Sequence, residues 1–357
     1  MSKGDLKLGS RRIILGLLLL SLVFPLLILT SACQDETREV PQLKQDYPEA
    51  GVLRICIVSD ASVYEPLIQE FEQRTDIWVD YRSIEERELF KTLGDLDADL
   101  ILGGTEEQYA THQKRFRPYQ VEKMAAIAAA YRNESMLWTP ISIQSSVIVY
   151  NPRVIDRQRD VETWEDLLDA SSEGQVAMAL PRNLGLFDSG LVAILEATCR
   201  DGADPHAVLD PLAKHLDESM FPSTKDVLES VANGIYAYGI ALEGQAQVAK
   251  NKRMHLDYFY PEEGNVAMFE CGAILKQARN VDNAETFLDF LLSTESQELL
   301  RKSFFRRSVF KEILPPPGMD ALSELGIEIL RADEWLAQGF DYNELMNWGE
   351  CDEAANP

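Results

Sequence analysis

The chain has 357 residues, a formal net charge of -25 and a hydrophobic fraction of 46%. This length is enough for two domains of ordinary size, and the apolar content is that of a globular protein. So large an excess of acidic side chains repels phosphate backbones, and we therefore expect no nucleic-acid partner.

The first 33 residues have the layout of a secretory signal peptide. Four basic residues within the first twelve positions precede an almost unbroken apolar run over residues 13–30, and two small residues then lead to Cys33. This ending resembles a bacterial lipobox, with Thr30 at the position where such a motif usually carries Leu. The resemblance implies cleavage before Cys33 and acylation of that residue.

Two alternatives stay open for this segment. The apolar run is near the lower length limit for a membrane span, so a transmembrane anchor or a leader cleaved without lipidation would also fit. Gly16 and Pro25 interrupt the run, which favours the lipoprotein. All three place the body of the protein outside the cytoplasm. We predict a signal peptide over residues 1–32 and a tether over residues 33–50; the leader carries a net +3, so the chain after it carries -28.

Besides Cys33, the sequence contains Cys56, Cys199, Cys271 and Cys351, and none of them forms a CxxC pair. This spacing indicates neither a zinc site nor a redox motif. Cys56 and Cys271 lie in apolar runs typical of buried strands, so we expect both to be buried free thiols. Export would permit a disulfide, but the spacing gives no pairing.

Short apolar runs alternate with amphipathic segments in the first part of the chain. We predict strands over residues 52–58, 77–81 and 99–102, and a helix that begins at Glu65 with a proline in its first turn. Thr105 follows the third strand and would cap the next helix. This alternation predicts an α/β fold with a mostly parallel sheet and helices on both faces, whose ligands bind beyond the C-terminal strand ends.

The same alternation resumes after Pro152. Further strands are predicted over residues 147–151, 176–180, 236–241, 256–260 and 266–275. Helix caps are predicted at Thr163, at Asp188 or Ser189, at Thr224 and at Asn283. Helical stretches are expected around Trp335 and Trp348.

Several blocks of the sequence occur in a recognisable order. They cover residues 60–68, 97–105, 149–152, 164–169, 232–240, 260–264, 273–276 and 322–325. Together they resemble blocks of the solute-binding proteins of ABC importers, in the subgroup that contains ferric-ion, phosphonate and sugar-phosphate binders.

The resemblance implies the type 2 periplasmic-binding fold. This fold has two α/β lobes, each a mostly parallel sheet flanked by helices, joined by two crossing strands that act as a hinge. The crossings would fall near residues 145–151 and 264–270. One lobe is then discontinuous, over residues 51–148 and 266–357, and the other covers residues 149–265. The ligand would bind between the lobes, which close over it.

The first candidate ligand residues follow predicted strands, where free backbone donors converge. Ser59, Asp60 and Ala61 follow the first strand, and Gly104 and Thr105 follow the third. Capping of the next helix is the alternative role for Ser59 and Asp60.

The proposed crossing and the second lobe supply further candidates. Ser145 and Ser146 would offer uncharged donors and acceptors; the alternative is that they are exposed strand hydroxyls. Phe187, Asp188 and Ser189 occupy the loop where relatives often carry a phosphate-wrapping sequence. This departure favours a ligand with an apolar or cationic part, or with hydroxyls that donate to the carboxylate.

Thr224, Lys225 and Glu243 complete the predicted ligand residues. Lys225 would offset the negative charge of the chain near an anionic ligand, and a solvated first-turn lysine is the alternative. Glu243 follows a predicted strand at a place where relatives carry ligand-binding residues. Ferric binders carry a tyrosine pair there, whereas residues 242–245 read Leu-Glu-Gly-Gln, so we expect no ferric site.

The sequence indicates a binding protein without a cofactor or a metal site. The four histidines show no metal-ligand spacing, and neither a GxSxG elbow nor a phosphate-binding Walker loop is present. We predict a monomeric, lipid-anchored receptor on the periplasmic side or cell surface. It would capture an organophosphate, a sugar phosphate or a similar polar metabolite for an ABC permease. The alternatives are a ligand-sensing partner of a membrane histidine kinase and a ferric-ion carrier; Tyr236 and Tyr238, which could supply phenolates, are expected to pack.

Overall fold

The computed structural model describes residues 51–58, 61–155, 161–172, 174–179, 189–199, 204–216, 219–262 and 264–331. Several predictions lie outside the described residues, namely those for the leader, Cys33, the tether, Ser59, Asp60, Phe187, Asp188, Cys351 and the helical stretches near Trp335 and Trp348. Within the described ranges, no helix is long and apolar enough to cross a membrane.

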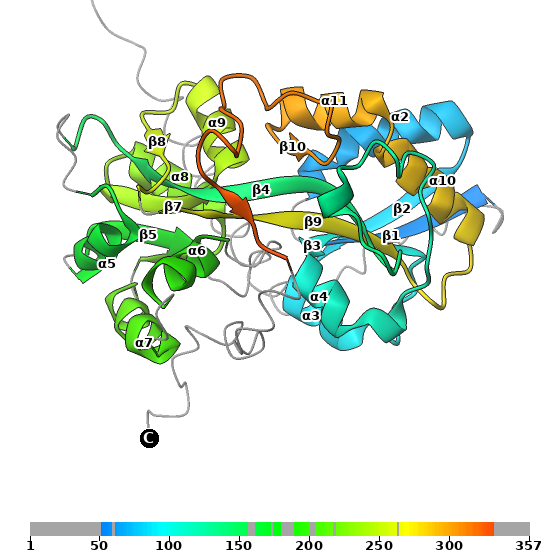
Figure 1. Ribbon diagram of the computed structural model, residues 1–357, viewed down its shortest axis with the longest axis horizontal. Helices are drawn as coiled ribbons and strands as arrows, with labels where there is room; N and C mark the ends of the chain where they lie inside the picture. Colours follow the sequence, from blue (N-terminus) through cyan, green and yellow to red (C-terminus); the bar gives the residue numbers. More distant parts are fainter. Residues whose placement is uncertain are drawn as a thin grey trace, which may run out of the picture. The chain divides into compact units, whose positions relative to one another are not determined.

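The strands of the described residues form an 11-stranded sheet. Along its main path the order is β2-β1-β3-β9-β4-β7-β5-β6, while β8 and β10 also pair with β4 and β11 pairs with β9 (Figure 1). The bounds are β1 Val52–Val58, β2 Trp78–Ile84, β3 Leu100–Thr105, β4 Thr139–Tyr150, β5 Val176–Ala179, β6 Met220–Phe221, β7 Tyr238–Leu242, β8 Asp257–Phe259, β9 Val266–Ile274, β10 Arg307–Ser308 and β11 Glu328–Ile329.

Strand direction divides this sheet into three parts. β1 is parallel to β2 and β3, and β5 is parallel to β6 and β7. β9 is antiparallel to β3 and β4, and β4 is antiparallel to β7. The parallel sets at the two ends match the prediction from strand–helix alternation, and the antiparallel pair β4–β9 lies between them.

Helices cover both faces of the sheet (Figure 1). Phe71 of α2 packs edge-to-face on Phe287 of α10, with ring centroids 4.8 Å apart, and Phe90 of α3 packs in the same way on Tyr109 of α4 at 5.7 Å. The helix bounds are α2 Glu65–Thr75, α3 Glu86–Thr92, α4 Glu106–Thr111, α5 Trp164–Ser172, α6 Ser189–Thr198, α7 Pro205–Leu216, α8 Thr224–Ala232, α9 Glu243–Asn251, α10 Val281–Leu291 and α11 Thr294–Ser303, with 3-10 turns η2 Ala61–Val63, η3 Gln113–Arg115 and η4 Ala129–Tyr131.

The unit β1–α2 shows why the first apolar run folds as predicted. β1 is almost wholly buried over the predicted residues 52–58. α2 begins at Glu65 with Pro66 in its first turn, where the missing amide donor is not needed. The helix ends at Asp76, which adopts a left-handed conformation (φ 56°) and donates its amide to the carbonyl of Glu72.

Strand β4 joins two hydrophobic regions of the molecule. Residues 139–145 pair with β9, and residues 146–150 pair with β7. Ile143 belongs to the core around α2 and α10, Ile148 to the core around α5, α6 and α7, and Val147 to the core around α8 and α9. Between Ile143 and Val147, residues 144–146 are polar and buried. The exact lobe boundaries stay a prediction.

Two helix caps differ from those predicted. The N-cap of α8 is Ser223, whose hydroxyl accepts the Asp226 amide at 3.3 Å, and not Thr224. α10 begins at Val281 after Asn280, and not at Asn283. Both predictions were wrong because several capping residues stand close together, and cap preference alone does not choose between them.

The predicted buried thiols are confirmed. Cys56, Cys199 and Cys271 are buried free cysteines. Burial raises the pKa of the Cys56 thiol, and raises that of Cys271 well above its usual range, so both are inert at neutral pH.

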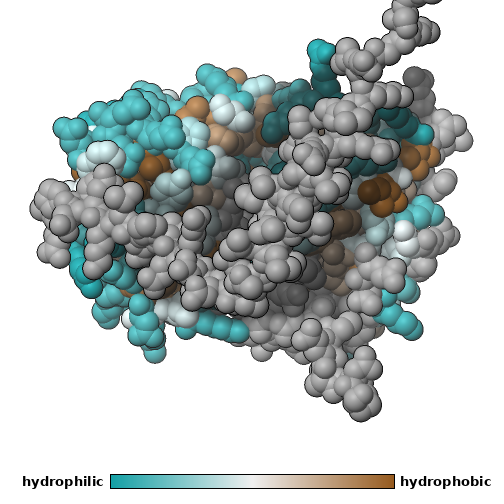
Figure 2. All heavy atoms as spheres, turned by 180° about the vertical axis from the view of Figure 1, so that it is seen from behind, coloured by the Kyte–Doolittle hydropathy of each residue, from teal (hydrophilic) through white to brown (hydrophobic). Residues whose placement is uncertain are grey.

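The surface agrees with the acidic composition. Seen from behind, the described residues present broad hydrophilic areas with smaller hydrophobic patches between them (Figure 2).

Candidate functional site

The turn at the end of β3 carries Gly104 and Thr105, two of the predicted ligand residues. Gly103 and Gly104 have φ values of 87° and 75°, a conformation that favours glycine, and a Cβ at Gly103 would lie 3.1 Å from the Cβ of Val58. Thr105 is the N-cap residue of α4, as predicted, but its hydroxyl makes no capping bond. That hydroxyl is buried without a hydrogen-bond partner among the described residues.

The two glutamates that begin α4 are both buried but differ in their partners. Glu106 accepts hydrogen bonds from Arg331 at 2.8 and 2.9 Å and from the Trp138 indole at 3.2 Å. Neither carboxylate oxygen of Glu107 has a hydrogen-bond partner in the described part of the chain. Burial raises the pKa of Glu107 to about 7, although the Thr105 hydroxyl lies close enough to oppose this rise.

The middle of β4 is polar and buried. Gln144, Ser145 and Ser146 are at most 2% exposed, so the serines are not exposed strand hydroxyls. The Ser145 hydroxyl donates to the carbonyl of Val266 at 2.7 Å, and the Asn265 amide donates to the carbonyl of Ser146 at 2.5 Å. Both amide atoms of Gln144 lack a partner within the described ranges. The hydrogen bonds of Ser145 and Asn265 thus hold β4 to the start of β9. Gln144 is the polar side chain of this stretch whose amide has no partner among the described residues.

The first turn of α8 places its two predicted residues in different environments. Thr224 is buried. The Lys225 side chain is 80% exposed, and its ammonium lies 3.9 Å from Glu229 one turn further along. An exposed pair of this kind contributes little to stability. Lys225 is a solvated lysine in this structure, and its contact with a ligand stays a prediction.

Glu243 begins α9 directly after β7, as expected, and is only 1% exposed. Its carboxylate accepts hydrogen bonds from the Nε and Nη2 of Arg307 at 2.8 and 2.9 Å and from the Tyr260 hydroxyl at 2.7 Å. A ligand would reach Glu243 only by displacing these partners. The sequence analysis missed Arg307 because an arginine beside another arginine gives no sign of burial.

Two other predicted residues lie at the starts of short elements. Ala61 is buried in η2, and Ser189 is the first residue of α6 and not its cap, while the other predicted cap, Asp188, lies outside the described residues. In the β3–β9 register, Thr105 lies beside Glu270. The structure therefore brings the β3 turn next to the crossing strands, while the complete set of ligand residues stays a prediction.

Four tyrosines could supply phenolates to an iron ion, namely Tyr236, Tyr238, Tyr258 and Tyr260. Tyr238 is buried in a hydrophobic core and Tyr236 packs edge-to-face on a phenylalanine, as expected. Tyr258 and Tyr260 lie nearer to Glu243, but burial and then the charge of Glu243 raise the pKa of Tyr258 to about 12 and that of Tyr260 further. The described residues contain no group of three or more His, Cys, Asp or Glu that could hold a metal ion.

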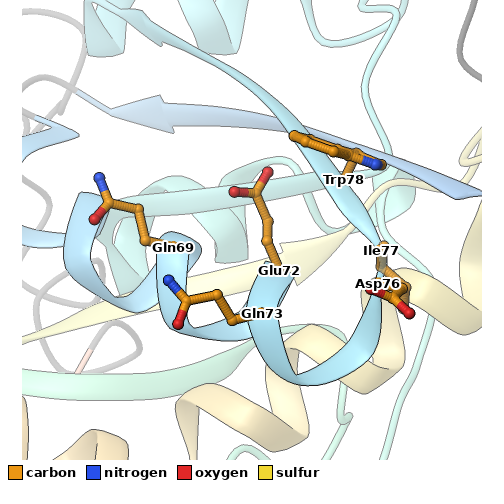
Figure 3. Close-up of a pocket in the computed structure, with 6 residues that line it drawn as sticks. All are labelled: Gln69, Glu72, Gln73, Asp76, Ile77 and Trp78. Atoms are coloured by element: carbon orange, nitrogen blue, oxygen red, sulfur yellow. The ribbon is translucent and has the colours of Figure 1, made fainter.

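A surface pocket lies where α2 ends and β2 begins (Figure 3). Glu72 points toward it, and its carboxylate already accepts the Val79 amide at 2.9 Å. The lining residues are Gln69, Glu72, Gln73, Asp76, Ile77 and Trp78. None of the predicted ligand residues is among them, so we do not assign the solute site to this pocket.

Sequence comparison decides the family. A family model described as bacterial extracellular solute-binding protein matches residues 67–325, which is most of the chain. The chain belongs to this family. The resemblance noted in the sequence blocks is therefore confirmed, and the family consists of binding proteins and not of enzymes.

Curated relatives match parts of this solute-binding protein. An uncharacterized protein of Haemophilus influenzae is 29% identical over 141 residues, which cover 39% of each chain. An Fe(3+)-binding periplasmic protein of Serratia marcescens is 24% identical over 197 residues, which cover 53% of this chain and 56% of that protein. The matched regions thus span about two fifths and just over half of these relatives.

Solved structures show the same two-lobe fold. Iron-bound HitA from Pseudomonas aeruginosa has a TM-score of 0.70 at 18% identity, covering 84% of this chain and 99% of that chain. AfuA from Actinobacillus pleuropneumoniae, with exogenous fructose-6-phosphate bound, has a TM-score of 0.69 at 20% identity, covering 84% and 98%. A two-component system protein described as mediating signal transduction has a TM-score of 0.67 at 21% identity, covering 80% and 99%. These likenesses confirm the type 2 periplasmic-binding fold. They do not identify the ligand of this chain.

Proposed function

We propose that this solute-binding protein is a lipid-anchored receptor, held at the membrane through acylated Cys33, that captures a small polar metabolite for an ABC permease. The ligand is an organophosphate, a sugar phosphate or a compound of similar polarity. It binds between the lobes, and the protein does no chemistry on it. We further propose that it acts as a monomer.

The observation that carries this proposal is the polar stretch of β4 between the hydrophobic cores. Residues 144–146 are buried and uncharged, and they lie between Ile143 of one core and Val147 of another. A strand that only filled a core would carry apolar side chains at such positions. Uncharged donors and acceptors at the junction of two lobes suit a polar ligand.

The charges near the β3 and β7 ends support the same ligand class. Glu106 and Glu243 are buried carboxylates, and each is neutralised by an arginine, Arg331 or Arg307. The region between these strand ends is therefore less negative than the net charge of -25 suggests. This removes much of the repulsion that an anionic ligand would otherwise meet.

Each alternative is favoured by a likeness to a known protein. The likeness to a two-component system protein favours a receptor that passes ligand occupancy to a membrane histidine kinase. The Serratia marcescens relative and HitA favour a ferric-ion carrier. A permease or a kinase encoded beside this chain would separate the importer from the sensor.

Calorimetry on the full chain tests the ligand class. We expect fructose 6-phosphate to bind with a stoichiometry of one and to raise the melting temperature, and ferric ion to do neither. Binding of ferric ion at one equivalent without any response to the sugar phosphate would replace the proposal by the ferric alternative.

A further inference from the structure

A buried polar cluster surrounds Glu270 of β9. The Ser142 hydroxyl donates to its carboxylate at 2.6 Å, and Nη1 of Arg306 lies 3.2 Å from the same oxygen. Thr105 and Ser142 flank Glu270 on the two neighbouring strands. Tyr64 is buried at the start of α2, and burial and then the charge of Glu270 raise its pKa well above its usual range. All five side chains are more than nine-tenths buried.

Much of the hydrogen-bonding capacity of this cluster is unused. The Tyr64 and Thr105 hydroxyls make no hydrogen bond of ordinary geometry with a described residue, and Nη1 of Arg306 contacts Glu270 as an ion pair only. Both amide atoms of Gln144 are also unpartnered in this part of the chain. Gln144 stands two positions after Ser142 in β4, hence on the same sheet face.

Such a concentration of unused groups needs an explanation. Most buried polar atoms in proteins have a hydrogen-bond partner, because a buried donor or acceptor without one lowers the stability of the fold. Three uncharged side chains, Tyr64, Thr105 and Gln144, break this rule beside the Glu270–Arg306 ion pair, and we take them to serve a ligand rather than the stability of the free protein. They come from separate segments, which meet where β3, β9 and β4 adjoin and where the chain leaves α11 for β10.

We infer that Tyr64, Thr105, Gln144 and Arg306, arranged around Glu270, form a subsite for the hydroxyl groups of the bound solute. This inference rests on the proposed function and names the part of the ligand that enters the cluster. Access requires the lobes to part, because the cluster is closed over in this structure.

The charge balance of the cluster selects hydroxyls over a phosphate. Glu270 and Arg306 cancel each other. The phenol, the threonine hydroxyl and the glutamine amide can each both donate and accept. A hydroxyl group also does both, whereas an ionised phosphate only accepts and would face the carboxylate of Glu270. In a sugar phosphate, the sugar would enter the cluster and the phosphate would lie outside it.

Melting of the ligand-free full chain tests whether the cluster is built for a ligand. Tyr64→Phe and Gln144→Met remove unused polar atoms, so we expect an unchanged or higher melting temperature. Tyr109→Phe and Gln297→Met are matched controls. Tyr109 donates to the carbonyl of Gly103 at 2.6 Å, and Gln297 donates to the carbonyl of Ile141 at 3.0 Å. The controls should melt at least about 2 °C lower. Cluster variants that melt as low as the controls would overturn the inference.

Binding assays then test the ligand class with two probes, fructose 6-phosphate and inorganic phosphate. Tyr64→Phe and Gln144→Met should weaken fructose 6-phosphate by about three- to tenfold each and leave inorganic phosphate unaffected. Equal binding of the sugar phosphate by wild type and cluster variants would also overturn the inference. If wild-type protein binds neither probe, the proposal that the ligand is a sugar phosphate or a similar phosphate compound is wrong. The melting comparison alone then decides whether the cluster is a binding site.

Discussion

Arg307 and Glu243 form a buried ion pair with two hydrogen bonds. The pair connects two segments that lie beside nearby positions of β4. Arg307 of β10 pairs with Ile143 of β4, while Leu242, which precedes Glu243, pairs with Ser146. A Cβ at Gly244 would lie 2.9 Å from the carbonyl oxygen of Phe304, so the start of α9 is pressed against the chain that leads to β10. The ion pair thus fixes α9 to the segment before β10 at the point where β4 passes between the cores.

Breaking this ion pair should destabilise the protein strongly. Glu243→Gln and Arg307→Met each leave a buried partner unpaired, and we expect each to lower the free energy of unfolding by about 3–5 kcal/mol. The double variant should lose clearly less than the sum of the two, because no single charge is then stranded. Urea unfolding of the four proteins measures this. If the free energy of unfolding of each single variant lay within about 0.5 kcal/mol of the wild-type value, the claim of a buried ion pair would be contradicted.

The pKa of Glu107 makes stability depend on pH. Its folded pKa of about 7 lies above the ordinary value of 4.5, so the folded state holds the proton more tightly than the unfolded state. The resulting stability is fully present below pH 4.5 and is lost as the pH rises through 7. The loss is about 3 kcal/mol at 1.36 kcal/mol per pKa unit. Glu107→Gln, which cannot ionise, should therefore melt higher than wild type at pH 8.

The pH dependence separates this effect from ordinary repacking. The gap in melting temperature between Glu107→Gln and wild type should narrow steadily from pH 8 to pH 5. Glu106→Gln serves as the contrast, because it removes the ion pair between that carboxylate and Arg331, and this variant should melt lower than wild type. A gap for Glu107→Gln that does not change with pH would refute the assignment.

Lys225 tests the anionic character of the ligand. Its side chain is 80% exposed, so Lys225→Ala should leave the melting temperature of the empty protein unchanged. If lobe closure brings the ammonium onto the phosphate, the affinity for fructose 6-phosphate should fall about ten- to a hundredfold, as expected for a charged hydrogen bond. Lys252→Ala is the control, because Lys252 is also an exposed lysine and lies within the same predicted lobe. Unchanged affinity would make Lys225 a surface lysine only.

Cys33 should carry the lipid that anchors the protein. Cys33→Ala removes the acyl acceptor, so we expect the variant to appear in the aqueous phase on detergent partitioning, or to retain its leader, whereas wild type enters the detergent phase. Identical partitioning of the two proteins would exclude lipidation at this residue.

Ferric ion should produce no coloured complex. A ferric–tyrosinate band requires phenolates, and Tyr258 and Tyr260 hold their protons because burial and Glu243 raise the pKa of both. We expect no visible absorption on addition of one equivalent of ferric ion at neutral pH. A band that disappears on mutation of Tyr236, Tyr238, Tyr258 or Tyr260 to Phe would establish the ferric carrier instead.

Most of the sheet could be predicted because each buried strand appears in the sequence as a short continuous run of apolar residues. The apolar run over residues 52–58 matches β1 residue for residue, and β9 ends one residue before its predicted limit. β4 begins eight residues earlier than expected, at Thr139. Residues 142–146 read Ser-Ile-Gln-Ser-Ser, and such a polar stretch does not look like a buried strand until its neighbours are known.

The candidate site was less predictable because its charges come from distant parts of the chain. The sequence marks strand ends such as Thr105 and Glu243, since turns and helix starts leave local signals. It does not show that Arg307 reaches Glu243 or that Arg331 reaches Glu106, 225 residues earlier. A carboxylate within an apolar run, such as Glu270, was the one available sign of the buried cluster.

Native mass spectrometry of the full chain, purified from its own cells without denaturation, tests the central claim most directly. A two-lobe receptor for a polar metabolite should carry one small molecule per chain, and the released compound should contain several hydroxyl groups with or without a phosphate. The same preparation of Gln144→Met should carry less of this compound than wild type. Protein that carries ferric ion, or that remains empty when saturated with extracts of its own cells, would contradict this account.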